Sequence, residues 1–489
     1  MRRWLKASLP LWILLLAGLV RFWGLGRESI WLDEATSIFI ARMDPSEIIV
    51  WVAADIHPPL YYLLLHFWTA LGQTESVVRA LSALFGVGAV AVTWALAREL
   101  FDSRVANIGA LLLAVSPLHV FYSQEARMYV MAASWSTLAS YMLILATRRG
   151  SNRYWLGYAL TSVLALYTHY FALFTLWFQG LFVLRWLWKR RPTKRLARRW
   201  LMSVLVIIGA FLPWTPTVIS QVLGGGGGWV ERAIGRPTLY ALIETWVQFS
   251  IGIEGRLYPA AMRRGAYLLY AACLLAALWA ARRSRNESER QSRREALLFC
   301  AGYVAVPLLT IWLLSQVKPM YTMRYLLPFL PPYCIWVASG LRSIPWRWPR
   351  IATGVVLILV LLAGDWYTLQ APQKPDWRSA SAYVAARVLP GDVALFSPRW
   401  NSKPFDYYAP ELLELNLDLP VPTTDEAARA AIVDIGQRYR RVWFFWQADH
   451  YGDPSAIAKR LLDAQFRPVE TREFRGLGSV ILYQVQDQR

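Results

Sequence analysis

Long apolar runs recur along this chain and constrain its fold more than any other feature. Of its 489 residues, 56% are hydrophobic, and a helix needs about 20 mostly apolar residues to cross a bilayer. The runs predict a polytopic α-helical membrane protein with about eleven transmembrane helices, the first an uncleaved span rather than a signal peptide. The predicted spans are 9–26, 77–97, 105–122, 128–147, 154–167, 171–188, 201–222, 266–281, 296–314, 325–341 and 351–367.

Positive charge is concentrated in short segments between these runs. The net charge is +20, but this distribution is typical of cytoplasmic loops and argues against nucleic-acid binding. With a cytoplasmic N-terminus, the basic clusters all fall on the cytoplasmic side, at 98–104, 148–153, 189–199, 282–294 and 342–350. A further apolar stretch, 59–71, is then interfacial, because counting it as a span would move these clusters outside.

The same alternation predicts outer loops at 27–76, 123–127, 168–170, 223–265 and 315–324. Five glycines at 224–228 predict a flexible linker, and 239–252 is typical of a surface-lying helix. The three cysteines fall in apolar runs, so no disulfide framework is predicted. Scarce lysine and abundant arginine favour the plasma membrane of a bacterium.

The chain changes character after residue 368. We predict a membrane domain over 1–368 and a small soluble α/β domain on the extracytoplasmic side over 369–489. The expected elements of this tail are helices at 377–388 and 454–464 and strands at 393–396, 442–446 and 480–485.

Two adjacent carboxylates, Asp33 and Glu34, directly follow the first predicted span. Carboxylates at a membrane edge are unfavourable unless they have a partner or a function. One facing a water-filled cavity could accept the proton of a hydroxyl during glycosyl transfer. The alternative is a helix start, in which either carboxylate interacts with the amides of a helix that begins at Ala35.

A second polar cluster, Asp55-Ile56-His57-Pro58-Pro59, lies in the same outer loop. The two prolines enforce an extended segment before the apolar helix that follows. His57 would then sit at the interface, where it could bind phosphate, ligate a metal or orient a substrate. The alternative is a histidine with no role beyond an interfacial turn.

Two tight outer loops contain further candidates. Glu125 and Arg127 either pair with each other or act separately, Glu125 facing the cavity of Asp33 and Arg127 gripping a phosphate with its planar fork. Tyr129 adjoins them as a substrate-binding candidate. His169 closes the other hairpin, where it either contacts substrate or is simply solvated.

Lys318, Arg324 and Tyr325 precede a predicted span on the outer side. The two cations could bind the phosphate of a lipid, or they could reach the headgroups of the bilayer. Positive charge is sparse on this side, which favours a function for Arg324.

The chain contains no Walker loop, dinucleotide fingerprint after a strand, paired CxxC or HExxH motif. An outer site also favours a membrane-anchored activated sugar over a cytosolic nucleotide sugar.

These motifs together resemble the GT-C glycosyltransferases over residues 1–370. The likeness is to the branch with protein O-mannosyltransferases, the aminoarabinose transferase of lipid A and Rgt-type lipopolysaccharide transferases. It rests on Asp33-Glu34-Ala35, His57-Pro58-Pro59-Leu60-Tyr61-Tyr62, Arg79, Ser116-Pro117-Leu118-His119, Glu125-Ala126-Arg127-Met128-Tyr129 and Arg324-Tyr325-Leu326-Leu327-Pro328.

The resemblance implies an inverting transfer from a polyprenyl-phosphate sugar to a hydroxyl of a glycolipid, polysaccharide or protein, as in cell-envelope glycosylation. Asp33 would activate the acceptor, with Glu34 and Glu125 as supporting carboxylates. The donor phosphate would be held by Arg127, Lys318 and Arg324. No cofactor is firmly implied; a divalent cation is open, and its candidate ligands are Asp33, Glu125, His57 and His169.

Two other classes fit parts of the sequence. A transporter or flippase of lipid-linked sugars would share the spans, but the carboxylates at span ends and the lack of two similar halves favour an enzyme. A membrane scaffold would act through its soluble tail alone.

Overall fold

The computed structural model describes residues 2–190, 194–223, 235–252, 258–283, 286–370, 372–397, 399–418, 424–447, 453 and 455–485. Its contacts divide the chain into two compact units. Unit 1 comprises Met1–Leu25 and Asp44–Ala371, and unit 2 comprises Gly26–Met43 and Pro372–Arg489. This division differs from the predicted one at two places, because Gly26–Met43 belongs to the unit of the C-terminal residues and the later boundary falls after residue 371 rather than after residue 368. The glycine run 224–228 lies outside the described residues.

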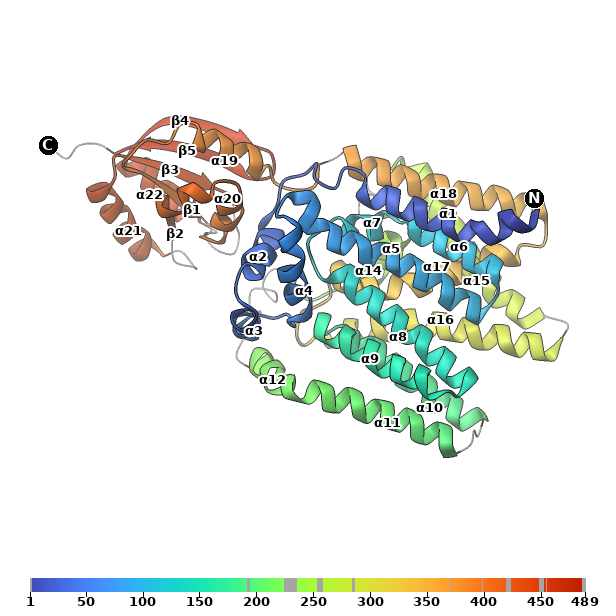
Figure 1. The fold of residues 1–489 in the computed structure, drawn as a ribbon. Helices are drawn as coiled ribbons and strands as arrows, with labels where there is room; N and C mark the ends of the chain where they lie inside the picture. Colours follow the sequence, from blue (N-terminus) through green and yellow to red (C-terminus); the bar gives the residue numbers. More distant parts are fainter. Residues whose placement is uncertain are drawn as a thin grey trace. The chain divides into compact units, whose positions relative to one another are not determined.

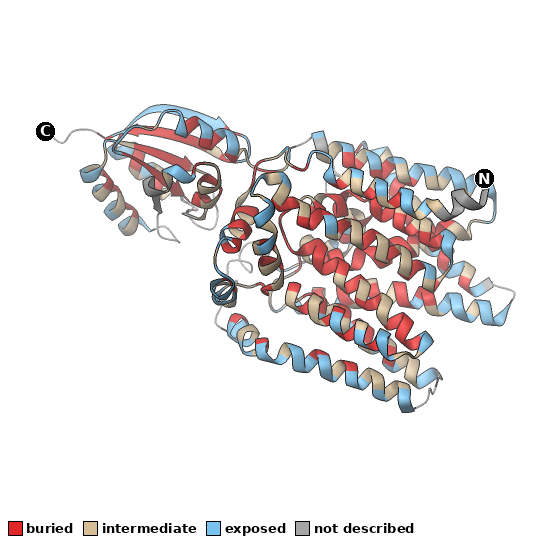
Figure 2. Cartoon of the chain, in the orientation of Figure 1, coloured by how far each residue is buried: buried red, intermediate tan, exposed pale blue. Residues whose placement is uncertain are grey.

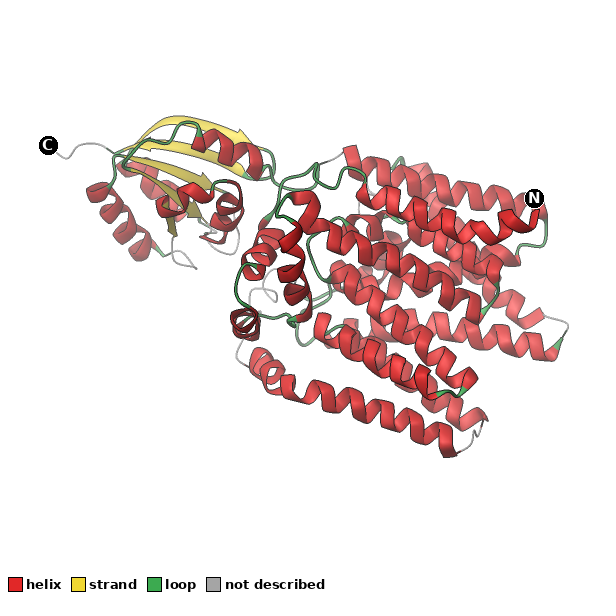
Figure 3. Ribbon diagram, in the orientation of Figure 1, coloured by secondary structure: helices red, strands yellow, loops and turns green. Residues whose placement is uncertain are grey.

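Unit 1 is a helical bundle (Figures 1 and 3). Its longer helices are α1 (Arg2–Phe22), α5 (Glu75–Leu100), α8 (Tyr129–Arg149), α9 (Asn152–Thr168), α10 (Ala172–Arg190), α11 (Lys194–Phe211), α15 (Ala260–Arg283), α16 (Glu287–Leu314) and α18 (Arg347–Gln370). Its shorter helices are α3 (Pro45–Ala54), α4 (Leu60–Trp68), α6 (Ser103–Ala114), α7 (Pro117–Ser123), α12 (Thr215–Leu223), α14 (Tyr240–Ile251) and α17 (Leu330–Ser343). Short 3₁₀ helices are Thr69–Leu71, Leu212–Trp214 and Met323–Phe329.

Six helices of the described chain are long and apolar enough to cross a membrane, or seven if the bent pair α6–α7 is one span. They are α5, α8, α11 continued by α12, α15, α16 and α18. The predicted number of about eleven is therefore not confirmed. Two of the remaining predicted spans, α9 and α17, are only 17 and 14 residues long.

The apolar stretch predicted to lie at the interface forms α4 and the 3₁₀ helix after it. Together they cover Leu60–Leu71. A helix of this length extends about 18 Å, which is short of the hydrocarbon core of a bilayer. α3 is similarly short, and it begins with a capping box between Asp44 and Glu47 and with Pro45 in its first turn.

The centre of unit 1 is α8, which packs against α5 and α9. Of its most apolar window, 78% is buried, against 17% for Lys194–Leu223, and Figure 2 shows the same contrast between α8 and α11. α8 ends at Gly150, which adopts a left-handed conformation with φ of 64° that glycine accepts without strain. The surface of α11 and α12 is rich in large exposed apolar side chains, as expected for helices that face lipid.

The predicted span 105–122 is broken in the structure. α6 and α7 meet at an angle of 59°, and Pro117 stands in the first turn of α7. Proline lacks the amide proton needed to continue the hydrogen bonds of α6, so Pro117 accounts for the position of the break.

Unit 2 contains a five-stranded sheet of order β2-β1-β3-β5-β4 (Figure 3). The strands are β1 (Asp392–Ser397), β2 (Asn416–Asp418), β3 (Arg441–Trp446), β4 (Arg467–Phe474) and β5 (Gly478–Gln484). β1 runs parallel to β2 and β3, whereas β5 is antiparallel to β3 and β4. The helices of unit 2 are α2 (Leu32–Ala41), α19 (Trp377–Ala385), α20 (Ser402–Tyr408), α21 (Asp425–Arg438) and α22 (Ile457–Gln465), with 3₁₀ turns at Arg399–Asn401 and Pro410–Leu415.

Both faces of this sheet are covered, because alternate residues of its strands point to opposite sides. On one face, Phe396 and Phe445 pack with Trp377 of α19. On the other, Phe444 packs with Ile432 of α21. The predicted strands at 393–396, 442–446 and 480–485 fall on β1, β3 and β5. β2, β4, α20 and α21 were not predicted, and residue 454 of one predicted helix lies outside the described residues.

Candidate active site

Polar and aromatic side chains gather at the end of unit 1 where α8 begins. They come from four segments: the turn before α4, the start of α8, the α9–α10 loop and the stretch after α16. The opposite end of the bundle carries the arginines, such as Arg148 and Arg149, which pair with Glu99 of α5. The 21 residues of α8 separate the two ends by about 30 Å.

Tyr129, the first residue of α8, is where two cations converge. Its hydroxyl accepts long hydrogen bonds from Nη2 of Arg127 at 3.4 Å and from Nη1 of Arg324 at 3.5 Å. The guanidinium carbons lie 5.6 and 5.9 Å from the centre of its ring, within the range of cation–π attraction. Arg127 and Tyr129 are buried. The arrangement brings two arginine forks to one place, which suits a phosphate group.

The backbone that presents Arg127 is fixed from two other helices. The hydroxyl of Ser82 in α5 donates to the carbonyl of Arg127 at 3.0 Å. Ser82 in turn shares a hydrogen bond of 3.0 Å with the hydroxyl of Tyr61 in α4. One turn before Ser82, the buried Arg79 donates to the carbonyl of Leu25 at 2.9 Å. Tyr61 and Ser82 thus fix the backbone at Arg127, and Arg79 ties α5 to the end of the segment that follows α1.

Two histidines lie next to this cluster. The ring centres of His57 and His169 are 5.9 Å apart, and His169 lies 4.8 Å from Tyr325. Nδ1 of His169 accepts a hydrogen bond from the amide of Phe171 at 3.1 Å, so the neutral ring carries its proton on Nε2. This buried Nε2 has no hydrogen-bond partner within the described part of the chain. Burial, together with the charges of His57 and Arg127, lowers the pKa of His169 well below its ordinary value.

His57 is oriented by Asp55, which the sequence analysis quoted without giving it a role. Nδ1 of His57 lies 3.3 Å from Oδ2 of Asp55. Burial raises the pKa of Asp55, but the hydrogen bond to His57 and the charges of His57 and Arg127 outweigh it and leave this pKa below its ordinary value. Asp55 is therefore a carboxylate at neutral pH, and it directs the other ring nitrogen of His57 away from itself.

A pocket of about 200 Å³ opens beside these groups, lined by His57, His169, Lys318 and Tyr325 among others. One wall is held by a chain of hydrogen bonds that the sequence did not reveal. The indole of Trp214 donates to the hydroxyl of Tyr170 at 2.9 Å, and this hydroxyl donates to Gln221 at 2.8 Å. Gln221 donates to the carbonyl of Val52 at 3.0 Å. Because Gln221 is a lone amide in an apolar helix, no motif signals it.

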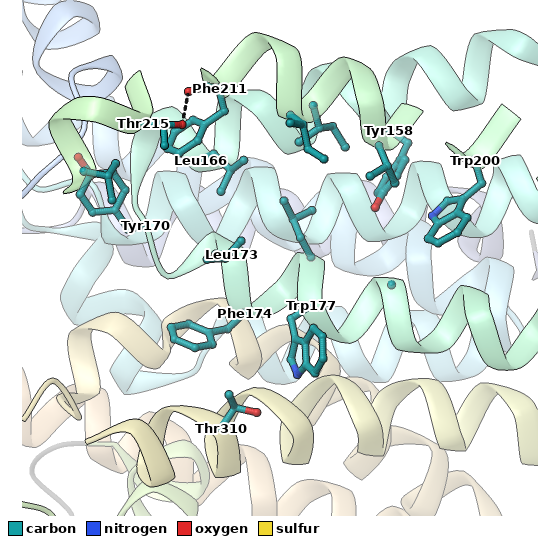
Figure 4. Close-up of a pocket in the computed structure, with 16 residues that line it drawn as sticks. Tyr158, Leu166, Tyr170, Leu173, Phe174, Trp177, Trp200, Phe211, Thr215 and Thr310 are labelled. Carbon is teal, nitrogen blue, oxygen red and sulfur yellow. Dashed lines mark hydrogen bonds between the residues drawn. The ribbon is translucent and has the colours of Figure 1, made fainter. Parts of the chain in front are cut away.

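A larger, almost wholly apolar cavity of about 820 Å³ lies among α9, α10, α11, α12 and α16. Figure 4 shows its lining, which includes Leu166, Phe174 and Trp177. Tyr170 and Val218 line both this cavity and the smaller pocket, so the two spaces adjoin. Its volume is in the range of ligand-binding cavities. The sequence could not predict this space, because its walls come from apolar runs that look alike.

The predicted carboxylates are divided between the two units. Glu125 is buried in the loop between α7 and α8 of unit 1. Asp33 and Glu34 lie in the first turn of α2, so the helix-start interpretation has the right position, although the helix begins at Leu32. Asp33 is half-buried, whereas Glu34 is completely buried and its Oε2 lies 3.1 Å from Nζ of Lys374.

Within the described residues, no group of three or more histidine, cysteine or acidic side chains could hold a metal ion. Within unit 1, the candidate ligands Glu125, His57 and His169 therefore do not form a divalent cation site, because such sites need several donors at about 2 Å from the ion.

Comparison with solved structures places this architecture. ArnT from Cupriavidus metallidurans in the apo state aligns with a TM-score of 0.60 and 14% identity, over 97% of each chain. The chain has the fold of the GT-C glycosyltransferases. ArnT bound to undecaprenyl phosphate aligns with a TM-score of 0.57 and 15% identity, over 98% of each chain. The oligosaccharyltransferase AglB from Archaeoglobus fulgidus, in complex with an inhibitory peptide and a dolichol-phosphate, gives a TM-score of 0.60 and 12% identity over 99% of this chain and 75% of AglB.

At the level of sequence, residues 56–216 match the family of dolichyl-phosphate-mannose-protein mannosyltransferases. No curated protein matches the chain. The resemblance to GT-C enzymes drawn from the motifs is thereby confirmed, and the protein is a multi-pass membrane protein. The matched segment contains His57, Arg127, Tyr129 and His169, which are the residues brought together at the start of α8.

Proposed function

We propose that this protein is a glycosyltransferase that moves a sugar from a polyprenyl-phosphate donor to a hydroxyl acceptor. The observation that carries the proposal is the convergence of Arg127 and Arg324 on Tyr129. Beside them, a small pocket that includes His169 and Lys318 adjoins a large apolar cavity. A lipid phosphate has one charged end and one long apolar end, which suit the arginine pair and the large cavity respectively.

The phosphate of the donor binds to Arg127 and Arg324, with Lys318 and the Nε2 proton of His169 as further donors. Arginine forks make paired charge-assisted hydrogen bonds to phosphate oxygens, which are stronger than bonds between neutral groups. The isoprenoid chain follows the path past Tyr170 and Val218 into the cavity among α9, α10 and α11. Tyr325 and Tyr129 offer aromatic faces beside the phosphate, where the sugar begins.

The acceptor oxygen attacks the anomeric carbon as the bond from that carbon to the phosphate oxygen breaks. The acceptor proton passes to the carboxylate of Asp33, and the electron pair of the broken bond leaves with polyprenyl phosphate. Negative charge grows on the departing phosphate, and fixed cations in a partly dry site stabilise this charge most in the transition state. Glu34 and Glu125 support this arrangement as buried carboxylates.

The site faces the outer side of the membrane in this proposal. The basic ends of α8 and α10 lie at the other end of the bundle, and short loops rich in lysine and arginine stay in the cytoplasm. A site on the outer side excludes cytosolic nucleotide sugars and agrees with a membrane-anchored donor.

The test is release of free polyprenyl phosphate when the purified protein is incubated with a panel of polyprenyl-phosphate sugars and hydroxyl acceptors. Asp33→Asn should lower turnover by about 10²–10⁴-fold, the usual effect of losing a general base. Folding and donor binding should remain near those of the wild type. Near-normal turnover in this variant would rule out Asp33 as the base, and transport of intact donor without release would indicate a flippase.

A further inference from the structure

The segment that carries Asp33 is fastened to the C-terminal residues of the chain. The carboxylate of Glu28 accepts hydrogen bonds from the amides of Gln373 at 3.0 Å and Lys374 at 3.1 Å. The amide of Ile30 donates to the hydroxyl of Tyr408 at 2.7 Å. These three hydrogen bonds hold the approach to α2 against the C-terminal part of unit 2, although 340 or more residues of sequence separate the partners.

α2 itself is attached by a buried ion pair. Nζ of Lys374 lies 3.1 Å from Oε2 of Glu34, and the two side chains are 7% and 0% exposed. Taking two charges out of water is unfavourable, and an apolar pair of similar volume is often as stable or more so. A buried ion pair is therefore weak evidence for stability as such. Its contribution here is geometric, because burial of both side chains keeps the Glu34 carboxylate next to Lys374.

That arrangement bears directly on Asp33. Successive residues of an α-helix project about 100° apart around its axis. An anchor on Glu34 therefore sets the rotation of the first turn and, with it, the direction in which the Asp33 side chain leaves the helix. The backbone of Asp33 is held in the same turn, because its carbonyl accepts a hydrogen bond from Ser37 at 3.0 Å.

We infer that Lys374 is a positioning residue for the proposed transfer: by holding Glu34 it aims the carboxylate of Asp33 at the acceptor. The inference rests on the proposed function, and it gives the C-terminal unit a role in the reaction. Lys374 touches no substrate in this scheme and acts through its ion pair with Glu34.

The experiment compares four variants of the full-length protein by release of polyprenyl phosphate. Lys374→Met should lower kcat by about 10–100-fold, since a misplacement of about 1 Å costs that order of rate, with the apparent KM for the donor within about twofold of wild type. Lys374→Arg keeps the ion pair and should retain most of the turnover. Lys403→Met is the matched control, because Lys403 contacts Thr36 and the ring of Phe39 on the same helix and should leave kcat near wild type.

The double variant Glu34→Gln/Lys374→Met separates positioning from stability. It removes both charges of this ion pair, so its thermal stability should recover relative to Lys374→Met, while kcat should stay low. Recovery of kcat together with stability would show that the pair only maintains the fold and would overturn the inference. A wild-type kcat in Lys374→Met would also overturn the inference. If either of these results is obtained while Asp33→Asn is inactive, the proposed function still stands. Full activity of Asp33→Asn would instead contradict the proposed function itself.

Discussion

Arg127 and Arg324 share one acceptor, the hydroxyl of Tyr129, at 3.4 and 3.5 Å. One arginine precedes α8 and the other follows α16, so only the fold brings them together. Paired guanidinium groups suit the oxygens of a phosphate. In the proposed function, these two arginines bind the phosphate of the donor.

Arg324→Ala should weaken binding of the donor more than it slows the chemical step. A hydrogen bond to a charged group contributes about 1.5–3 kcal/mol, which corresponds to about a 10–100-fold rise in the dissociation constant for polyprenyl phosphate. Arg324→Lys should recover only part of the affinity, because an ammonium cannot make the paired bonds of a guanidinium. Titration of the purified protein with polyprenyl phosphate measures this. Arg149→Ala, at the far end of α8, serves as the control, and equal effects of the two alanine variants would contradict the assignment.

Filling the apolar cavity should affect long donors selectively. Gly180 lines it on α10, and a Cβ atom added there has no atom within 4 Å. Because the space next to this position belongs to the cavity, Gly180→Phe should fold and occupy space that the isoprenoid chain needs. We expect the KM to be at least about tenfold higher for an undecaprenyl donor and to change little for a short-chain donor. Losing about 1–2 kcal/mol of binding free energy from apolar burial has an effect of this size. The control is Gly209→Phe on α11, where an added Cβ atom also has no atom within 4 Å. An equal rise in KM for short and long donors would show that the isoprenoid chain does not bind in this cavity.

The two ends of the bundle should label from opposite sides of the membrane. The native cysteines Cys273, Cys300 and Cys334 are buried, so a single introduced cysteine gives a clean signal. A membrane-impermeant maleimide added to intact cells should modify Lys318→Cys and leave Arg149→Cys unmodified, and inverted vesicles should reverse the pattern. Labelling of Arg149→Cys from outside would reverse the proposed topology, because positive loops remain cytoplasmic.

The stability of unit 2 should depend on pH through Asp392. This buried carboxylate accepts hydrogen bonds from Arg441 at 2.8 and 2.6 Å and from the indole of Trp443 at 2.9 Å. Burial raises the pKa of Asp392, but these bonds outweigh it and the net pKa lies below the ordinary value. A lowered folded pKa stabilises the fold above the unfolded pKa of about 3.9, and the contribution is lost as pH falls through the folded value.

Thermal unfolding of the full-length protein from pH 7 to pH 3 tests this directly. Asp392→Asn should lose about 3 kcal/mol at pH 7, because it leaves Arg441 without its carboxylate, and its stability should vary less below about pH 5. Asp434→Asn, which removes an exposed pair with Arg438, should cost under about 1 kcal/mol. A wild-type pH profile in Asp392→Asn would show that another group controls acid stability.

Much of unit 1 could be predicted from the sequence because its signals are local. Apolar runs identify helices such as α5, α8 and α16, and the basic segments mark one end of the bundle. The break between α6 and α7 at Pro117 was not predicted, because the apolar run 105–122 continues across it. In unit 2, the short apolar strands β1, β3 and β5 were also predicted from the sequence. β4 was missed, because seven of its eight residues are exposed on a sheet edge and show no alternation.

The candidate site was predicted as a set of residues and not as an arrangement. His57, Arg127, Tyr129, His169 and Arg324 were named from their motifs and span ends. Their convergence depends on the register and rotation of α8, α9 and α16 against one another, which no single segment encodes. The partners Asp55, Tyr170 and Gln221 were assigned no role for the same reason.

By itself, the amino-acid sequence determined which segments are apolar helices, where charge collects and which short motifs carry carboxylates and cations, since each depends on neighbours in the chain. Only the tertiary structure decided that Glu34 pairs with Lys374, that α2 belongs with the C-terminal sheet, and that the apolar cavity adjoins the pocket that includes His57 and Lys318. These features join residues far apart in sequence, and they exist because side chains from separate helices are packed in one geometry.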